Sequence, residues 1–137
     1  MMRKLTPTAT IASALALLLP LELHARADDD KVTPVFSAVL ASAPGQTLTV
    51  VKVDYPPGGK SARHRHAGSV FAYVLSGAIR SENSATGPSR VYQAGESFFE
   101  PAGSEHRISE NASQKDPASL LAVFVAPDGA VLKTTDQ

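Results

Sequence analysis

Residues 58–66 read GGKSARHRH, and this segment ends in two histidines that are separated by one residue. Side chains of a β-strand alternate between its two faces, so His64 and His66 share one face if the segment is extended. Two imidazoles on one face can bind the same metal ion. The next histidine along the chain is His106, some forty residues on. The spacing predicts a metal site that the fold assembles from separate strands.

The sequence on both sides of this segment consists of short runs rich in β-branched and aromatic residues, separated by Gly, Pro and polar turn residues. The strand-like runs are residues 35–40, 47–53, 69–75, 78–82, 90–93, 96–100, 106–109 and 120–125. After residue 28, no segment keeps a helical period over about eleven residues. Roughly eight short strands with regular turn signals predict one all-β, antiparallel sandwich or barrel.

The start of the chain has the features of a secretory signal peptide. A positively charged beginning precedes an apolar run at residues 11–19, and Ala25 and Ala27 are small residues at the two positions that signal peptidase reads. The apolar run is shorter than the ~20 residues that span a bilayer. We therefore expect a signal peptide at 1–27, a folded domain at 28–137, a periplasmic or secreted location, and no membrane span after cleavage.

Composition limits the partners and the chemistry. Thirteen basic and thirteen acidic side chains give a net charge of zero, and the sequence contains no run of Lys and Arg. We therefore expect neither nucleic acid nor an anionic membrane surface as a partner. The sequence contains no cysteine, so thiolate ligands and thiol nucleophiles are excluded. Any metal must be held by histidine, carboxylate, amide oxygen or water.

Two spaced motifs resemble those of the cupin family. The first motif of that family contains a glycine, a His-X-His pair, a glutamate and a second glycine, and the second contains glycine, proline, glycine, histidine and asparagine. The matching residues here are Gly58, His64, His66 and Gly77 in the first motif, and Gly95, Pro101, Gly103 and His106 in the second. Val70 stands where the family has its glutamate, and Glu110 stands where it has the asparagine.

The resemblance implies a jelly-roll β-barrel or sandwich in which His64, His66 and His106 bind a divalent transition metal: Fe, Mn, Zn, Ni or Cu. The alternation that places the two histidines inward also places Val70 inward, so the carboxylate ligand of the family is missing there. Neutral imidazoles favour transition metals over Mg or Ca, and a missing ligand leaves coordination positions open. Glu100, a carboxylate in an apolar strand, is the candidate for its replacement; the alternative is a solvated residue at a strand end.

Three functions remain open from the sequence. The first is an exported metal-binding cupin protein that binds or transforms a small molecule inside the barrel. The second is a three-histidine Fe(II) dioxygenase-like enzyme, and the third is a non-catalytic module that binds a sugar-like small molecule. A degenerate cupin, in which the histidines are only polar core residues, is a further alternative. Isomerase chemistry is disfavoured because no additional histidine is available as an acid or base.

Several side chains near the motifs are assigned to the surface, the core or an interface. Arg63, Arg65 and Arg107 have the opposite alternation from the histidines and are expected to point outward. Phe71 and Tyr73 are expected to pack in the core rather than to line the pocket.

The resemblance also implies a homodimer, because many small cupins pair through an outer strand and twofold assembly is common.

Overall fold

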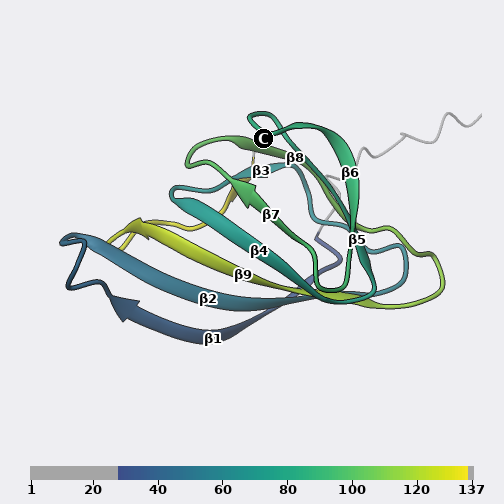
Figure 1. Cartoon of the computed structure of the whole chain (residues 1–137), viewed down its shortest axis with the longest axis horizontal. Coiled ribbons are helices and arrows are strands. Elements are labelled where there is room, and N and C mark those ends of the chain that lie inside the picture. Colours follow the sequence, from purple (N-terminus) through teal and green to yellow (C-terminus); the bar gives the residue numbers. More distant parts are fainter. Residues whose placement is uncertain (1–27, 136–137) are drawn as a thin grey trace, which may run out of the picture.

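The computed structural model describes residues 28–135, which form two five-stranded antiparallel sheets packed as a sandwich (Figure 1). These residues contain no helix, and hence none that could cross a membrane. The all-β jelly-roll architecture expected from the strand pattern is confirmed. The signal peptide expected at 1–27 lies outside the described residues.

The first sheet, which we call sheet A, has the strand order β1-β2-β9-β4-β7. Its strands are β1 (Lys31–Val39), β2 (Gln46–Tyr55), β9 (Ala118–Pro127), β4 (Ser69–Ser76) and β7 (Ser97–Glu100). These are the apolar, β-branched runs of the sequence, which suit a pleated surface. The last long strand of the chain, β9, lies at the centre of the sheet, between β2 and β4.

The second sheet, sheet B, has the order β10-β3-β8-β5-β6. Its strands are β10 (Thr134–Thr135), β3 (His64–Arg65), β8 (Glu105–Asn111), β5 (Ala78–Asn83) and β6 (Gly87–Gln93). Ten strands form in residues 28–135, where the sequence predicted roughly eight. Both β3 and β10 have only two residues, too few to produce a periodic pattern, and they form because each finds a neighbour in the folded protein.

The interior has an apolar wall and a polar wall. Sheet A contributes the apolar wall, with Val70, Val74, Leu120 and Phe124 all buried. Sheet B faces it with buried polar side chains, which are His64, Ser81, Asn83, His106, Ser109 and Asn111. Sheet B therefore supplies most of the buried hydrogen-bonding groups and sheet A most of the apolar lining, with Glu100 of β7 as a buried charged residue on sheet A.

The expected burial of Phe71 and Tyr73 is wrong. Both side chains lie on the outer face of sheet A, with 46% and 41% of their surfaces exposed. The inward positions of the strand are taken by Val70, Ala72 and Val74, so strand alternation places the two aromatic residues outside. Because β4 is apolar at both sets of positions, its sequence does not reveal which set faces the core.

Candidate metal centre

The structure brings His64, His66 and His106 together inside the sandwich. His64 on β3 lies directly opposite His106 on β8 in the antiparallel register, and His66 follows one residue after the end of β3. All three are buried, and one ring nitrogen of each lies within 4.8 Å of the corresponding nitrogens of the other two. The fold thus groups the three histidines as the spacing predicted.

Two backbone carbonyls determine how two of the rings are oriented. His64 Nδ1 donates a hydrogen bond to the Ala62 carbonyl oxygen at 2.6 Å, and His66 Nδ1 donates to the Leu132 carbonyl oxygen at 2.7 Å. A carbonyl oxygen can only accept, so both Nδ1 atoms carry hydrogen. In the neutral rings, both Nε2 atoms are therefore bare acceptors, which is the form that binds a metal.

The two bare nitrogens lie close together. His64 Nε2 and His66 Nε2 are 3.1 Å apart, and neither ring has a proton to place between them when both are neutral. Burial lowers the pKa of His64 from 6.5 to about 4, and burial also lowers the pKa of His66 despite the nearby Glu100 carboxylate. At neutral pH the repulsion between the lone pairs is therefore not relieved by protonation. A cation between the two nitrogens would relieve it.

Glu100 at the end of β7 also belongs to this centre. Only 3% of the surface of Glu100 is exposed, so the alternative that it is a solvated residue at a strand end is wrong. His106 Nδ1 lies 3.0 Å from Glu100 Oε2, and the Ser81 hydroxyl bonds to His106 Nε2 at 2.9 Å. Burial alone raises the pKa of the Glu100 carboxyl, but the hydrogen bond from His106 and the imidazoles nearby outweigh this effect, so the net pKa is lowered. Glu100 is thus a buried carboxylate that remains ionised.

The sheet register explains how Glu100 reaches the histidines. In the antiparallel pairing of β4 with β7, Glu100 is the direct partner of Val70. Paired residues project from the same face of a sheet, and both side chains line the same cavity. Val70 has the position of the family's glutamate, so this chain presents a carboxylate one strand further along, at nearly the same place in the barrel.

The Nε2 atoms of His64 and His66 have the spacing of two ligands on one transition-metal ion, and Glu100 lies nearby. Bonds of about 2.1 Å at tetrahedral or octahedral angles place neighbouring ligand atoms about 3.0–3.4 Å apart. The separations are 3.1 Å between the Nε2 atoms of His64 and His66, 3.0 Å from Glu100 to His106, and 3.9 Å from Glu100 to His66 Nε2. The three histidine nitrogens lie within 4.8 Å of one another, and His106 would have to give up its hydrogen bond to Glu100 or to Ser81 to bind the same ion.

A cavity of about 140 Å³ adjoins the histidines. An engineered apolar cavity of ~150 Å³ accommodates benzene, so a ligand of about that size fits. Most of the wall is apolar and comes from sheet A; it includes Val53, Ala72, Leu120, Ala122 and Phe124. The three histidines thus border a largely apolar cavity whose size suits a small molecule.

A chain of hydrogen bonds between polar side chains forms a second polar part of this wall, apart from the histidines and Glu100. The Tyr55 hydroxyl bonds to Ser61 Oγ and to Ser109 Oγ, each at 2.8 Å, and Ser61 donates to Asp30 Oδ1 at 3.0 Å. All four residues line the cavity. Burial raises the pKa of Tyr55 to about 12, so its hydroxyl stays protonated at neutral pH.

Sequence reasoning missed several of these groups. Ser81 is an inward polar residue of β5, and strand alternation with the buried Ile79 could have indicated it. The carbonyls of Ala62 and Leu132 leave no side-chain signal at all. The three arginines that flank the histidines in sequence do point outward as expected, and Arg63, for example, pairs with Glu105 on the surface.

The metal-free protein is expected to lose stability as the pH falls from 7 to 4. Unfolding returns His64 to its usual pKa near 6.5, whereas the folded protein holds it near 4, so the unfolded chain binds more protons in this range. Its contribution is a loss of about 3 kcal/mol of unfolding free energy, complete below pH 4. Urea denaturation of the metal-free protein at several pH values measures the unfolding free energy. Equal stability at pH 7 and pH 4.5 would contradict the buried neutral imidazole.

A family model that describes a cupin domain matches residues 51–124, more than half of the chain. This chain is a member of the cupin family. The resemblance found in the two motifs is therefore confirmed, and the matched segment includes all three histidines, Val70 and Glu100. A search of curated protein sequences finds no match.

Solved structures with the same cupin fold include enzymes of different activities. An oxalate oxidase in complex with glycolate, a substrate analogue, is 25% identical over 73% of this chain and 52% of its own, with a TM-score of 0.57. A recombinant oxalate oxidase in complex with glycolate is 23% identical over 81% and 57%, with a TM-score of 0.61. The DMSP lyase DddQ of Ruegeria pomeroyi is 20% identical over 64% and 42%, with a TM-score of 0.55. This chain spans about half the length of each.

Proposed function

We propose that this cupin binds one divalent transition metal through His64, His66 and His106 and uses it to bind or transform a small molecule in the adjoining cavity. The observation that carries the proposal is the pair of bare Nε2 atoms 3.1 Å apart, each oriented by a carbonyl on its other nitrogen. Such an arrangement is unfavourable without a cation and is well suited to one. If the histidines were only polar core residues, as in a degenerate cupin, two bare nitrogens would not have to face each other.

Glu100 is the fourth ligand in this proposal. A carboxylate compensates part of the charge of the dication, which three neutral imidazoles do not. The resulting set of nitrogen and oxygen donors suits Fe, Mn, Zn, Ni or Cu and not Ca, which takes oxygen ligands. Four protein ligands would still leave two positions of an octahedral ion open for a substrate. The metal would act there as a Lewis acid or a redox centre.

The cavity favours a compact ligand that chelates the metal at one end. A sugar-like molecule carries hydroxyl groups on all sides and would leave them unpaired against Leu120, Ala122 and Phe124. The apolar wall therefore favours the metal-centred function over the sugar-binding module. An oxalate oxidase of related fold has been solved in complex with the substrate analogue glycolate, which is a compact, oxygen-rich molecule. An O2-dependent oxidation is the second candidate, because open metal positions beside a dry wall suit it.

We also propose that the protein works outside the cytoplasm. The charged start, the short apolar run and the small residues Ala25 and Ala27 support export, and so does a domain with no thiol to oxidise. A metal site that is buried and partly closed by the segment around Leu132 would retain its ion after export.

Elemental analysis of the protein isolated from its native host is expected to find about one transition-metal ion per chain. N-terminal sequencing of the same sample is expected to begin at Asp28. Oxygen uptake by the iron-loaded protein with glycolate or a catechol then separates oxidation from plain binding. A sample without metal that also fails to take up Fe, Mn, Zn, Ni or Cu would refute the metal centre, and an unprocessed N-terminus would refute export alone.

A further inference from the structure

Four polar residues of the cavity wall form a connected strip, which we call the hydroxyl strip: Asp30, Ser61, Tyr55 and Ser109. Its hydrogen bonds run from Ser109 through Tyr55 and Ser61 to the carboxylate, with lengths of 2.8, 2.8 and 3.0 Å. Tyr55 and Ser109 are buried, with 3% and 6% of their surfaces exposed. The proposed metal centre uses none of these four side chains, so their order has another cause.

The carboxylate at one end of the hydroxyl strip fixes the position of every hydroxyl hydrogen. A carboxylate oxygen can only accept, so the one hydroxyl hydrogen of Ser61 is donated to Asp30. Ser61 must then accept from Tyr55, and this bond takes the phenol hydrogen. The remaining contact is therefore donated by Ser109 to the Tyr55 oxygen. Burial raises the pKa of Tyr55 to about 12, so the phenol hydrogen is present at neutral pH.

All three hydroxyl hydrogens are thus used inside the hydroxyl strip. A serine hydroxyl has one hydrogen and two lone pairs, and Ser109 has given its hydrogen to Tyr55. Toward the cavity, Ser109 therefore presents lone pairs, as does the Asp30 carboxylate. The side chains of the strip can accept a hydrogen bond from a molecule in the cavity, but they cannot donate one.

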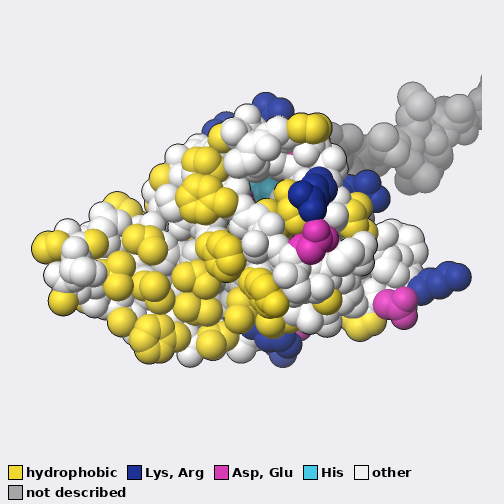
Figure 2. Space-filling view, in the orientation of Figure 1, with side chains coloured by type: hydrophobic (Ala, Val, Ile, Leu, Met, Phe, Trp, Pro, Cys, Tyr) yellow, Lys and Arg dark blue, Asp and Glu magenta, His cyan; other side chains and the backbone are white. Residues whose placement is uncertain are grey.

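Ser109 lies beside the metal centre. In the pairing of β5 with β8, Ser109 is the direct partner of Ser81, whose hydroxyl bonds to His106 Nε2 at 2.9 Å. The Cβ atoms of such cross-strand partners are about 4.5–5.5 Å apart. A small patch of histidine surface is visible in Figure 2, so solvent reaches the centre on this face. A small molecule that enters the cavity can therefore contact the histidines and Ser109 together.

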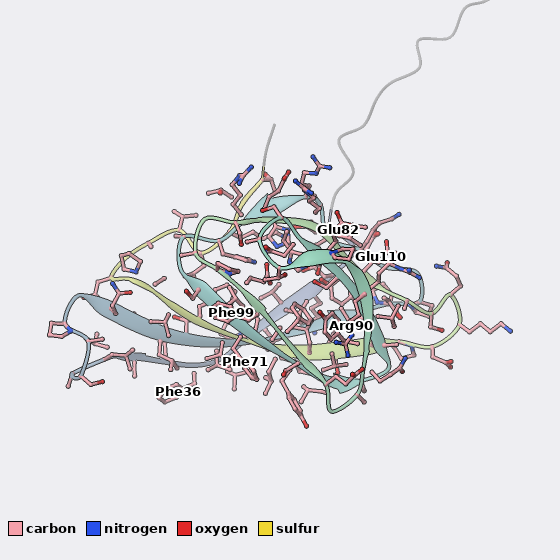
Figure 3. All side chains as sticks on the ribbon, turned by 45° about the horizontal axis from the view of Figure 1, so that its top comes forward. Phe36, Phe71, Glu82, Arg90, Phe99 and Glu110 are labelled. Carbon is pink, nitrogen blue, oxygen red and sulfur yellow. The ribbon has the colours of Figure 1, made fainter. Side chains whose placement is uncertain are left out.

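A β-bulge in β8 makes this arrangement possible. His106 and Ser109 are three residues apart, so regular alternation would place them on opposite faces of sheet B. The register between β5 and β8 shifts by one residue at Arg107, and both side chains are buried as a result. Glu110, the next residue, pairs with Arg80 on the outer side of the sheet (Figure 3). Bulges of this kind redirect side chains and are frequent next to active sites.

We propose that the small molecule in the cavity carries a hydroxyl group, which donates a hydrogen bond to the hydroxyl strip at Ser109. The inference rests on the proposed function and names its ligand class: a compact alcohol or phenol whose apolar part lies against sheet A. A carbonyl, ether or carboxylate oxygen at the same place would face lone pairs and the Asp30 charge. A protonated amine could donate, but the metal ion and Lys133, which lines the same cavity, disfavour another cation.

Cyclopentanol and cyclopentanone test the proposal on the purified, Zn-loaded protein. Both are neutral and about the size of benzene, but only the alcohol can donate a hydrogen bond. We expect cyclopentanol to bind at least about tenfold more tightly, because the ketone leaves the lone pairs of Ser109 unpaired in an apolar cavity. NMR titration measures both dissociation constants. Zn occupies the histidines, so bare imidazole nitrogens do not contribute to the preference.

Tyr55→Phe is expected to reduce this preference to less than about threefold, because Ser109 can then turn its hydrogen toward the cavity and bind the ketone. Asp30→Asn is expected to change the preference in the same direction. An amide can donate to Ser61, which permits the reverse order of donation along the strip. Tyr73→Phe is the matched control, since Tyr73 is 41% exposed on the outer face of sheet A, and it should keep the full preference.

Zn uptake by each variant shows that it is folded and tests the metal centre separately. A wild type that takes up no Zn would refute the proposed function. Equal affinities for the alcohol and the ketone, or no binding of cyclopentanol, would overturn the ligand class and leave the metal centre standing. A preference that survives both Tyr55→Phe and Asp30→Asn would also overturn it, because the direction of the strip would not be its cause. If Tyr55→Phe does not fold, Asp30→Asn decides.

Discussion

Replacing His64 by alanine is expected to remove stoichiometric metal binding. His64 Nε2 is one of the two bare nitrogens that face each other at 3.1 Å, and its loss leaves His66 without the opposing donor. Loss of even an outer partner of a metal ligand weakens affinity about 10–100-fold, so loss of the ligand itself is expected to cost at least about 100-fold. Titration with Zn or Mn, followed by calorimetry, measures the change.

A matched control separates this effect from a general loss of structure. Arg63 is adjacent in sequence but its side chain is 59% exposed and paired with Glu105 on the surface. Arg63→Ala is expected to bind metal with wild-type affinity. His64→Ala should also gain no thermal stability from added metal, whereas the wild type should be stabilised in proportion to the logarithm of metal concentration. Equal affinities for His64→Ala and the wild type would rule out the proposed centre.

The second large effect concerns the carboxylate. Glu100→Gln keeps the shape of the side chain but removes its charge, and we expect metal affinity to fall about 10–100-fold. Because Glu100 and Val70 are direct partners on neighbouring strands, the exchange variant Val70→Glu/Glu100→Val should recover most of the affinity. The same titration measures both variants.

The exchange variant distinguishes a ligand from a structural hydrogen-bond acceptor. In the metal-free arrangement, Glu100 accepts from His106 Nδ1 at 3.0 Å, and a purely structural role would be confined to that contact. Glu100→Gln would then lower thermal stability while metal affinity stays the same, and the exchange would restore nothing. That result would leave a three-histidine centre and remove Glu100 from it.

Much of the fold followed from residues close together in the sequence. The β-branched runs and the Gly and Pro turns between them predicted strands at nearly all the places where strands of four or more residues occur. Local alternation correctly placed Val70 and the two histidines inward and the three arginines outward. It failed for Phe71 and Tyr73, because a strand that is apolar on both faces has no polar face to indicate the solvent side.

The histidines and the two cupin motifs were evident from sequence, because spacing along a strand is itself a spatial relation. The sequence made Glu100 only a candidate beside the alternative of a solvated residue, since its burial near the histidines depends on the register between β4 and β7, which pairs it with Val70. The orientation of the rings depends on the carbonyls of Ala62 and Leu132, and the second of these comes from the far end of the chain.

The sequence by itself determined the class of fold, the family and the three imidazoles, because these depend on alternation and spacing within short segments. Only the tertiary structure decided which carboxylate joins the histidines and which nitrogens are bare. Each of these depends on the pairing of strands distant in sequence, and that pairing is set by the packing of the whole sandwich.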